Sequence, residues 1–240
     1  MKGRLVVVVV AALVPLILAT NGIRVLANDW FVRFEYGRLP ADPYGFTQAQ
    51  RTELGLTGLH SILPRSDRGI DLLREARLPT GGVAFRQKEL RHMGDVRRLI
   101  GITYPAHLAA LAAIAALGLA LGLSRRGRSL VPRGLEYGAA LMLAVAAGVA
   151  VAVAVNADGF LTGFHTLFFE GESWRFREDD TLRRLYPDRF WSETAILLGL
   201  GAAVQAGLVL GAGRLVRRRR RQAIGARRRT PLRAPAQPRS

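Results

Sequence analysis

The chain has 240 residues, half of them hydrophobic, and carries 35 lysines and arginines against 18 acidic residues. It contains no cysteine, which excludes disulfides, thiolate nucleophiles and cysteine-based metal sites. The apolar residues are concentrated in blocks separated by charged segments, a distribution typical of a multi-pass membrane protein rather than of one soluble domain.

Four apolar blocks are each close to the roughly 20 residues that cross about 30 Å of hydrocarbon as a helix. They lie at residues 5–23, 99–123, 135–155 and 195–216. The blocks are rich in Ala, Leu and Gly and lack the alternating pattern of a barrel strand. The sequence therefore predicts an all-α membrane protein, with a four-transmembrane-helix bundle spanning residues 1–216.

The basic residues indicate how such a bundle is oriented. Lys2 and Arg4 precede the first block, an arginine-rich inner loop (residues 124–134) joins the second to the third, and the run Arg217–Arg221 follows the fourth. Four crossings place these segments on one side, so the positive-inside rule predicts cytoplasmic N and C termini. We expect the basic tail, residues 217–240, to be disordered and to contact anionic lipid rather than nucleic acid.

Two segments are then extracytoplasmic. Residues 24–98 are expected to form a small loop domain between helices 1 and 2, with short helices at Gln48–Glu53 and Ile70–Leu78. Residues 156–194 are expected to form an interfacial helical loop between helices 3 and 4, whose last helix is predicted to be capped by Ser192.

The first block also has the basic start and apolar middle of a signal peptide, with a small-residue cleavage site at residues 25–27. We favour a retained transmembrane helix. The aromatic residues that follow it, Trp30 to Tyr36, fit an interfacial belt.

A first candidate for chemistry lies just before the second block, in the stretch Glu89-Leu-Arg-His92-Met-Gly-Asp95-Val. On a helix, Glu89 and Asp95 are each three residues from His92, within reach of its imidazole. At 1.5 Å per residue, His92 lies roughly 10 Å outside the hydrocarbon. The spacing predicts an oriented histidine at the membrane surface.

A second histidine, His165, follows the third block in an apolar stretch in which Leu161, Phe164 and Phe168 share one helical face. Two distant segments thus bring a histidine to the same outer depth. Imidazole titrates near neutrality, so a pair can divide the taking and giving of a proton. For acyl transfer at the ester level of the lipids, His92 suits the base and His165 the donor that stabilises an oxyanion.

Other functions are weaker fits to these residues. No serine lies in a Gly-x-Ser-x-Gly setting, so we expect no covalent acyl-enzyme. The histidines lack His-x-x-x-His spacing, so we predict neither a metal nor another cofactor. His107, within the second block, and His60, in the outer loop, are interpreted as structural and surface residues. A non-enzymatic membrane protein that binds lipid or a protein partner remains open.

Three motifs together resemble a known family. They are Glu89-x-x-His92-Met93-x-Asp95-Val96, Phe164-His165-x-x-Phe168-Phe169 with Trp174, and Leu185-Tyr186-Pro187-Asp188-Arg189-Phe190-Trp191. In this arrangement the chain resembles the bacterial integral membrane family that contains the lipoprotein intramolecular transacylase, Lit.

The resemblance implies an acyltransferase that moves the sn-2 acyl chain of a diacylglyceryl-modified lipoprotein to the α-amino group of its N-terminal cysteine, giving the lyso-form. It implies that His92 and His165 are catalytic, supported by Glu89, Asp95, Phe164 and Trp174. The implied partners are diacylglyceryl-modified lipoproteins and membrane lipids, with no nucleic acid. The implied location is the bacterial cytoplasmic membrane, with the site facing outside.

Overall fold

A computed structural model describes the backbone of residues 2–124, 127–169 and 171–229, with side chains described through Leu215. The described residues are mostly helical, with one isolated β-bridge between Arg77 and Val83. Four helices are long and apolar enough to cross a membrane. These are α1 (Lys2–Leu26), α5 (Gln87–Gly122), α6 (Leu130–Val155) and α9 (Asp188–Arg229). The shorter helices are α2 (Asp29–Tyr36), α3 (Gln48–Ile62), α4 (Asp71–Glu75), the 3-10 turn η1 (Gly127–Ser129), α7 (Ala157–Phe168) and α8 (Thr181–Leu185).

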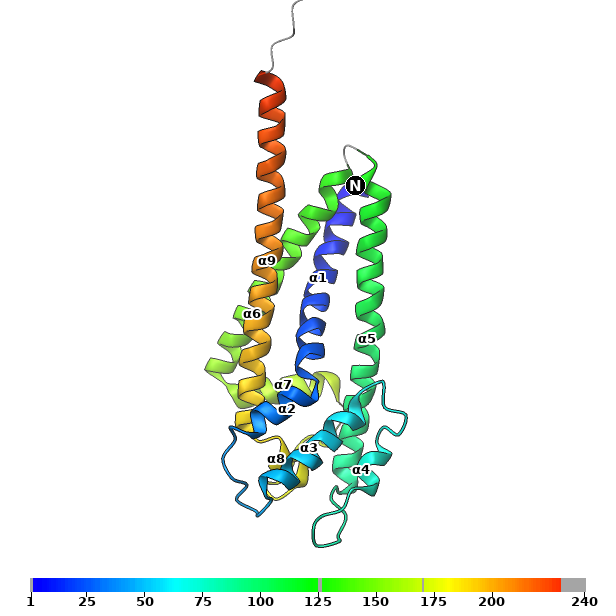
Figure 1. Cartoon of the computed structure of the whole chain (residues 1–240), viewed down its shortest axis with the longest axis vertical. Helices are drawn as coiled ribbons and strands as arrows, with labels where there is room; N and C mark the ends of the chain where they lie inside the picture. The colour runs from blue at the N-terminus through cyan, green and yellow to red at the C-terminus, as the bar shows by residue number, and fades with distance from the viewer. Residues whose placement is uncertain (1, 125–126, 170, 230–240) are drawn as a thin grey trace, which may run out of the picture.

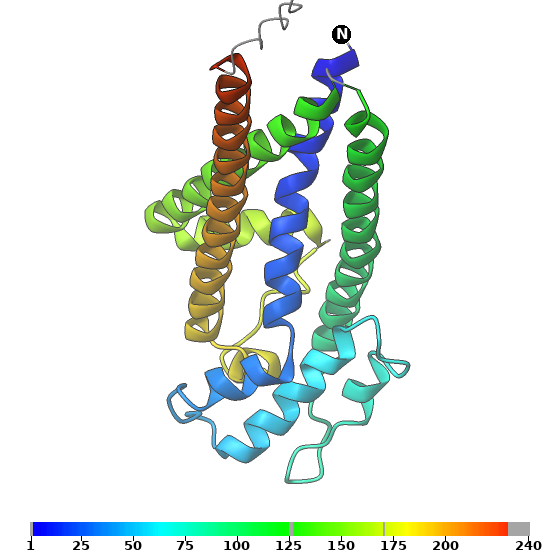
Figure 2. The ribbon, with the colours of Figure 1, turned by 45° about the horizontal axis from the view of Figure 1, so that its top comes forward.

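The long helices form a bundle with α1 at its centre, flanked by α5 on one side and by α6 and α9 on the other (Figures 1 and 2). The start of α1, η1 and the last turns of α9 lie at one end, while α2, α3, α4 and α8 gather at the other (Figure 1). The prediction of four helices that are long and apolar enough to cross a membrane is confirmed.

The contact between α1 and α6 depends on glycine. A Cβ atom on Gly138 would lie 2.5 Å from the Cβ of Val14, and one on Gly134 would lie 2.5 Å from the Cβ of Val10. Hydrogen in place of a side chain lets the two backbones approach closely, as small residues do between membrane helices. The small-residue composition of the third apolar block therefore has a packing function.

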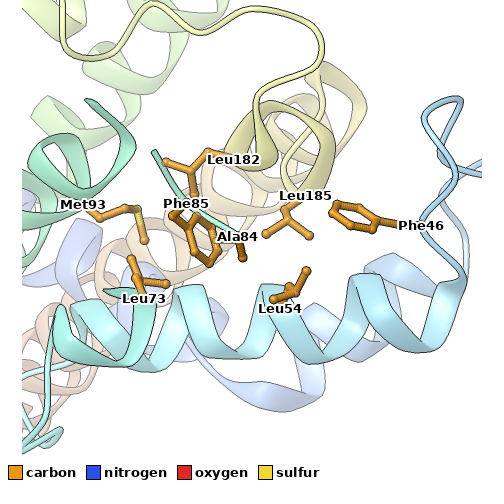
Figure 3. Close-up of a cluster of buried hydrophobic side chains, with 8 residues drawn as sticks. All are labelled: Phe46, Leu54, Leu73, Ala84, Phe85, Met93, Leu182 and Leu185. Atoms are coloured by element: carbon orange, nitrogen blue, oxygen red, sulfur yellow. The ribbon is translucent and has the colours of Figure 1, made fainter. Parts of the chain in front are cut away.

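A small helical cap covers one end of the bundle. Eight buried apolar side chains from α3, α4, α5, α8 and the segments between them form its core (Figure 3). They are Phe46, Leu54, Leu73, Ala84, Phe85, Met93, Leu182 and Leu185. Met93 belongs to the second turn of α5, so this core fixes the direction in which the neighbouring His92 leaves the helix.

Several element boundaries differ from those expected. α3 extends to Ile62 and α4 is limited to Asp71–Glu75. α9 begins at Asp188, so Ser192 is not an N-cap; its hydroxyl donates to the carbonyl of Asp188 within the helix. α9 also continues to Arg229 where a disordered tail was predicted, consistent with the high helix propensity of Arg and Ala. Residues 230–240 of that tail lie outside the described residues.

Candidate active site

The two histidines singled out in the sequence meet in space. His92 comes from the second turn of α5 and His165 from the last turn of α7, and their ring centroids lie 6.1 Å apart. Phe169 packs against both, with its centroid 5.2 Å from that of His92 and 5.6 Å from that of His165. Phe176 contacts the His92 ring at 5.3 Å. One small substrate group can therefore contact both imidazoles.

A backbone hydrogen bond determines the tautomer of neutral His165. Its Nδ1 lies 2.8 Å from the carbonyl oxygen of Leu161, one turn earlier in α7. A carbonyl only accepts hydrogen bonds, so Nδ1 carries the proton and the Nε2 lone pair is free. The indole of Trp174 stacks on the same ring, with centroids 4.5 Å apart. His165 is thus held in place with a basic nitrogen available.

Two buried ring nitrogens at this site have no hydrogen-bond partner among the described residues: Nδ1 of His92 and Nε1 of Trp174. Buried polar atoms are normally paired, and an exception indicates a site completed by a ligand or water. The indole nitrogen only donates, so it requires an acceptor. The pair of histidines therefore lies beside an unused donor.

Burial keeps both imidazoles neutral. His92 precedes the apolar segment of α5, which begins at Leu99; burial and then the proximity of His165 lower the pKa of His92 to about 4. Burial also lowers the pKa of His165, with the hydrogen bond to Leu161 opposing this effect. Neutral imidazole is the form that accepts a proton from a substrate.

This state predicts the pH dependence of any reaction that uses the pair. Both pKa values are depressed below 6.5, so we expect the rate to be insensitive to imidazole protonation above that pH and to fall as the pH drops below it. The check is an initial-rate profile from about pH 4 to 8 on protein in detergent or vesicles.

The stability of the folded protein is also expected to fall as the pH drops. A histidine with a depressed pKa takes up its proton more readily in the unfolded state, so stability is lost as the pH falls below 6.5 towards the folded-state pKa. Melting curves at each pH separate the two effects. A fall of about tenfold between pH 8 and 7 with unchanged melting would contradict the prediction.

The two acids expected to orient His92 contact other groups. Glu89 is 1% exposed, and its carboxylate accepts from the backbone N–H of Leu182 and of Arg86, both at 2.7 Å. Asp95 pairs with Arg98 at 3.4 Å. Neither acid hydrogen-bonds to His92 in the part of the chain that the structure describes. Glu89 instead joins the start of α5 to α8, and burial raises its pKa.

Of the other supporting residues expected from the sequence, Trp174 lies on His165 and Phe164 contacts its edge, with centroids 5.5 Å apart. Phe164 is 43% exposed on the outer face of α7, where Leu161 and Phe168 are also exposed. Sequence reasoning missed Phe176, because no spacing relates it to either histidine. Phe169 was part of the quoted motif, but its contact with both rings was not expected.

A cavity of about 670 Å³ lies between α5 and the segment that follows α7. Neither histidine lines it, but Phe169, which packs against both, forms part of its wall. Arg91, Asp95 and Glu172 line it together with the apolar Leu99, Ile102 and Phe168. Leu99 and Ile102 belong to the membrane-spanning part of α5, whereas Arg91 lies before it. The cavity therefore offers apolar and charged walls to one amphipathic ligand.

The remaining histidines lie elsewhere. His60 contacts the carboxylate of Asp29, with Nε2 and Oδ1 2.7 Å apart, in a partly exposed pair. His107 is buried in the membrane-spanning part of α5. Among the described residues no group of three or more His, Asp or Glu side chains is placed to hold a metal ion.

A family model described as lipoprotein intramolecular transacylase Lit matches residues 6–191, most of the chain. The chain belongs to the Lit family. An uncharacterized protein of Aquifex aeolicus (strain VF5) is 28% identical over 212 residues, which cover 88% of this chain and 94% of that protein. The resemblance inferred from the three motifs is therefore confirmed.

Solved structures agree with the Lit fold. The membrane-integral lipoprotein intramolecular transacylase Lit from Bacillus cereus superposes with a TM-score of 0.76 at 19% identity, covering 92% of this chain and 98% of that one. A variant of the same protein, in which one histidine is replaced by alanine, superposes with a TM-score of 0.72 at 17% identity, covering 92% and 96%. This Lit family member is thus a multi-pass membrane protein with the fold of those structures.

Proposed function

We propose that this Lit family member is an intramolecular acyltransferase acting on diacylglyceryl-modified lipoproteins. It moves the sn-2 acyl chain to the α-amino group of the lipoprotein's N-terminal cysteine. The observation that carries the proposal is the meeting of His92 and His165, 6.1 Å apart, with the Nε2 lone pair of His165 free. The family membership supports the same class of reaction.

The residues can divide the reaction as follows. The nitrogen of the substrate amine attacks the ester carbonyl, which forms the C–N bond and an oxyanion, while Nε2 of His165 takes a proton from that amine. The N–H of Trp174 and that of His92 are the donors available to the oxyanion. When the intermediate collapses, the C–O bond to the glyceryl oxygen breaks, and that oxygen receives the proton held by His165. The products are an amide and a free hydroxyl, without added water.

This division reverses the roles expected from the sequence, in which His92 was the base and His165 the donor. The hydrogen bond from His165 to the carbonyl of Leu161 supports the reversal, because it leaves His165 an acceptor nitrogen. His92 has no such bond, and its burial favours a neutral ring with one N–H to donate.

The cavity supports the substrate class. A diacylglyceryl cysteine combines two acyl chains with a charged amine and a peptide, so it needs apolar and charged walls next to the reacting groups. Leu99, Ile102 and Phe168 provide the apolar wall. The charged wall carries the basic Lys88, Arg91 and Arg98 and the acidic Asp95 and Glu172. We infer that this end of the bundle faces outside, where such lipoproteins reside, in agreement with the arginines at the other end.

The test is the acylation state of a lipoprotein N-terminus made with and without this protein. Intramolecular transfer leaves the total mass unchanged, so the sample is treated with mild alkali, which cleaves esters and spares amides, before mass spectrometry. We expect one acyl chain to remain as an amide on the cysteine only when the protein is present. An N-terminus that loses both chains even when the protein is present would overturn the proposal.

A further inference from the structure

A second groove, of about 620 Å³, lies between α1 and α6 near the start of α1. The start of α1 is at the end of the bundle opposite α7 (Figure 1). Most of its walls are apolar, with Val7, Val8 and Leu141 among them. Its basic and hydroxyl groups are those of Arg4, Arg133 and Tyr137.

The polar and apolar residues follow one another in the same order on both helices. Along α1, Arg4 is followed one turn later by Val8 and two turns later by Ala12; along α6, Arg133 is followed by Tyr137 and then Leu141. Each turn rises about 5.4 Å, so the arginines mark one end of the groove and the apolar residues lie about 10 Å deeper. The groove matches a ligand with an anionic head and a long apolar tail.

The two arginines at its mouth have no acidic partner among the described residues. Neither Arg4 nor Arg133 forms an ion pair within the described ranges. Both α1 and α6 begin at this end, and neither has an acidic residue in its first turn. The helix dipoles therefore add partial positive charge at this end, which favours an anion.

We propose that this groove binds one anionic phospholipid from the adjacent leaflet. Its phosphate lies between the guanidinium groups of Arg4 and Arg133, and the Tyr137 hydroxyl, one turn deeper, is placed for the ester region. One acyl chain lies along Val8, Ala12 and Leu141. The site is distinct from the histidine pair and does not depend on the acyltransferase activity.

Native mass spectrometry of the detergent-purified full chain, titrated with phosphatidylglycerol or phosphatidylcholine, tests this site. We expect the wild type to retain one phosphatidylglycerol at least about tenfold more tightly than phosphatidylcholine, because each arginine near a lipid phosphate contributes to affinity. The double variant Arg4→Gln/Arg133→Gln should lose this preference. The matched control is Lys2→Gln, which removes an exposed charge at the same end but outside the groove, and it should retain the lipid.

A second variant keeps the charge and fills the space. Ala12 is exposed on the groove surface, so Ala12→Phe should fold normally and displace the lipid. The proposal is overturned if Ala12→Phe retains phosphatidylglycerol as the wild type does. It is equally overturned if Lys2→Gln weakens binding as much as the double variant, or if the two lipids bind alike, because either result indicates diffuse attraction rather than a site.

Discussion

His165→Ala is expected to lower the rate of acyl transfer by about 10²- to 10⁴-fold, the range that a positioned acid–base group contributes. His92→Ala should cause a loss of similar order, because it removes the ring that faces His165 at 6.1 Å. Both side chains are only partly buried, so the variants should still insert and fold. Alkali-resistant acylation of a lipoprotein substrate measures the rate, and melting in detergent monitors the fold.

The substitution His165→Asn distinguishes loss of the basic nitrogen from loss of the hydrogen bond that holds the His165 side chain. The amide nitrogen of asparagine is placed to replace Nδ1 of His165 and donate to Leu161, but asparagine has no basic nitrogen in place of Nε2. His165→Asn should therefore melt like the wild type and be as inactive as His165→Ala. Full activity in His165→Asn would show that only the hydrogen bond matters and would remove His165 as the base.

The matched control is His60→Ala, which deletes a histidine at the same end of the protein, in a partly exposed pair with Asp29. Surface changes of this kind cost little, so activity should stay within about twofold of the wild type. If instead the variants at His92 and His165 fail to accumulate as folded protein, the histidines are structural, and the non-enzymatic interpretation is favoured.

The features that depend on chain-local patterns were predictable. Apolar length alone identified the four long helices, because a bilayer requires about 20 apolar residues per crossing. The pairing of His92 with His165 was predictable for a related reason: each lies just outside an apolar block, so both are held at one depth. Once the depth of both histidines in the membrane is fixed, only their positions within the membrane plane are left undetermined.

The buried partner of Glu89 was not predictable, because it comes from a residue distant in sequence. Helical spacing placed Glu89 within reach of His92, but its carboxylate instead satisfies the backbone N–H of Leu182, 93 residues away. Helical spacing shows which side chains are close enough to form a hydrogen bond. It does not show which of the nearby donors, here the N–H of Leu182, a buried carboxylate will bind.

Glu89 is expected to be the residue on which the site depends for stability. Its 1% exposed carboxylate accepts two backbone hydrogen bonds at 2.7 Å, from Arg86 at the start of α5 and from Leu182 in α8. Glu89→Ala leaves both N–H groups without this acceptor. The bond to Leu182 is buried, whereas that to Arg86 is only partly buried and its N–H can bind water. We therefore expect a loss of about 1–3 kcal/mol, mainly from the N–H of Leu182, measured as a lower melting temperature in detergent.

The control for stability is Asp95→Ala in the same helix. Asp95 pairs with Arg98 at 3.4 Å, and its side chain is 32% exposed while that of Arg98 is 77% exposed, so solvent screens the pair. Its removal should cost no more than about 1 kcal/mol.

Comparing Glu89→Ala with Asp95→Ala distinguishes two roles for Glu89, an anchor between α5 and α8 or a group that orients His92. As an anchor, Glu89→Ala lowers the melting temperature, and its activity recovers on cooling with an unchanged pH profile. A group that orients His92 would instead shift the acid limb of the profile without lowering the melting temperature, and that outcome would contradict the anchoring role. Because Leu182 and Met93 share one buried core, loss of the anchor also loosens the turn of α5 that carries His92.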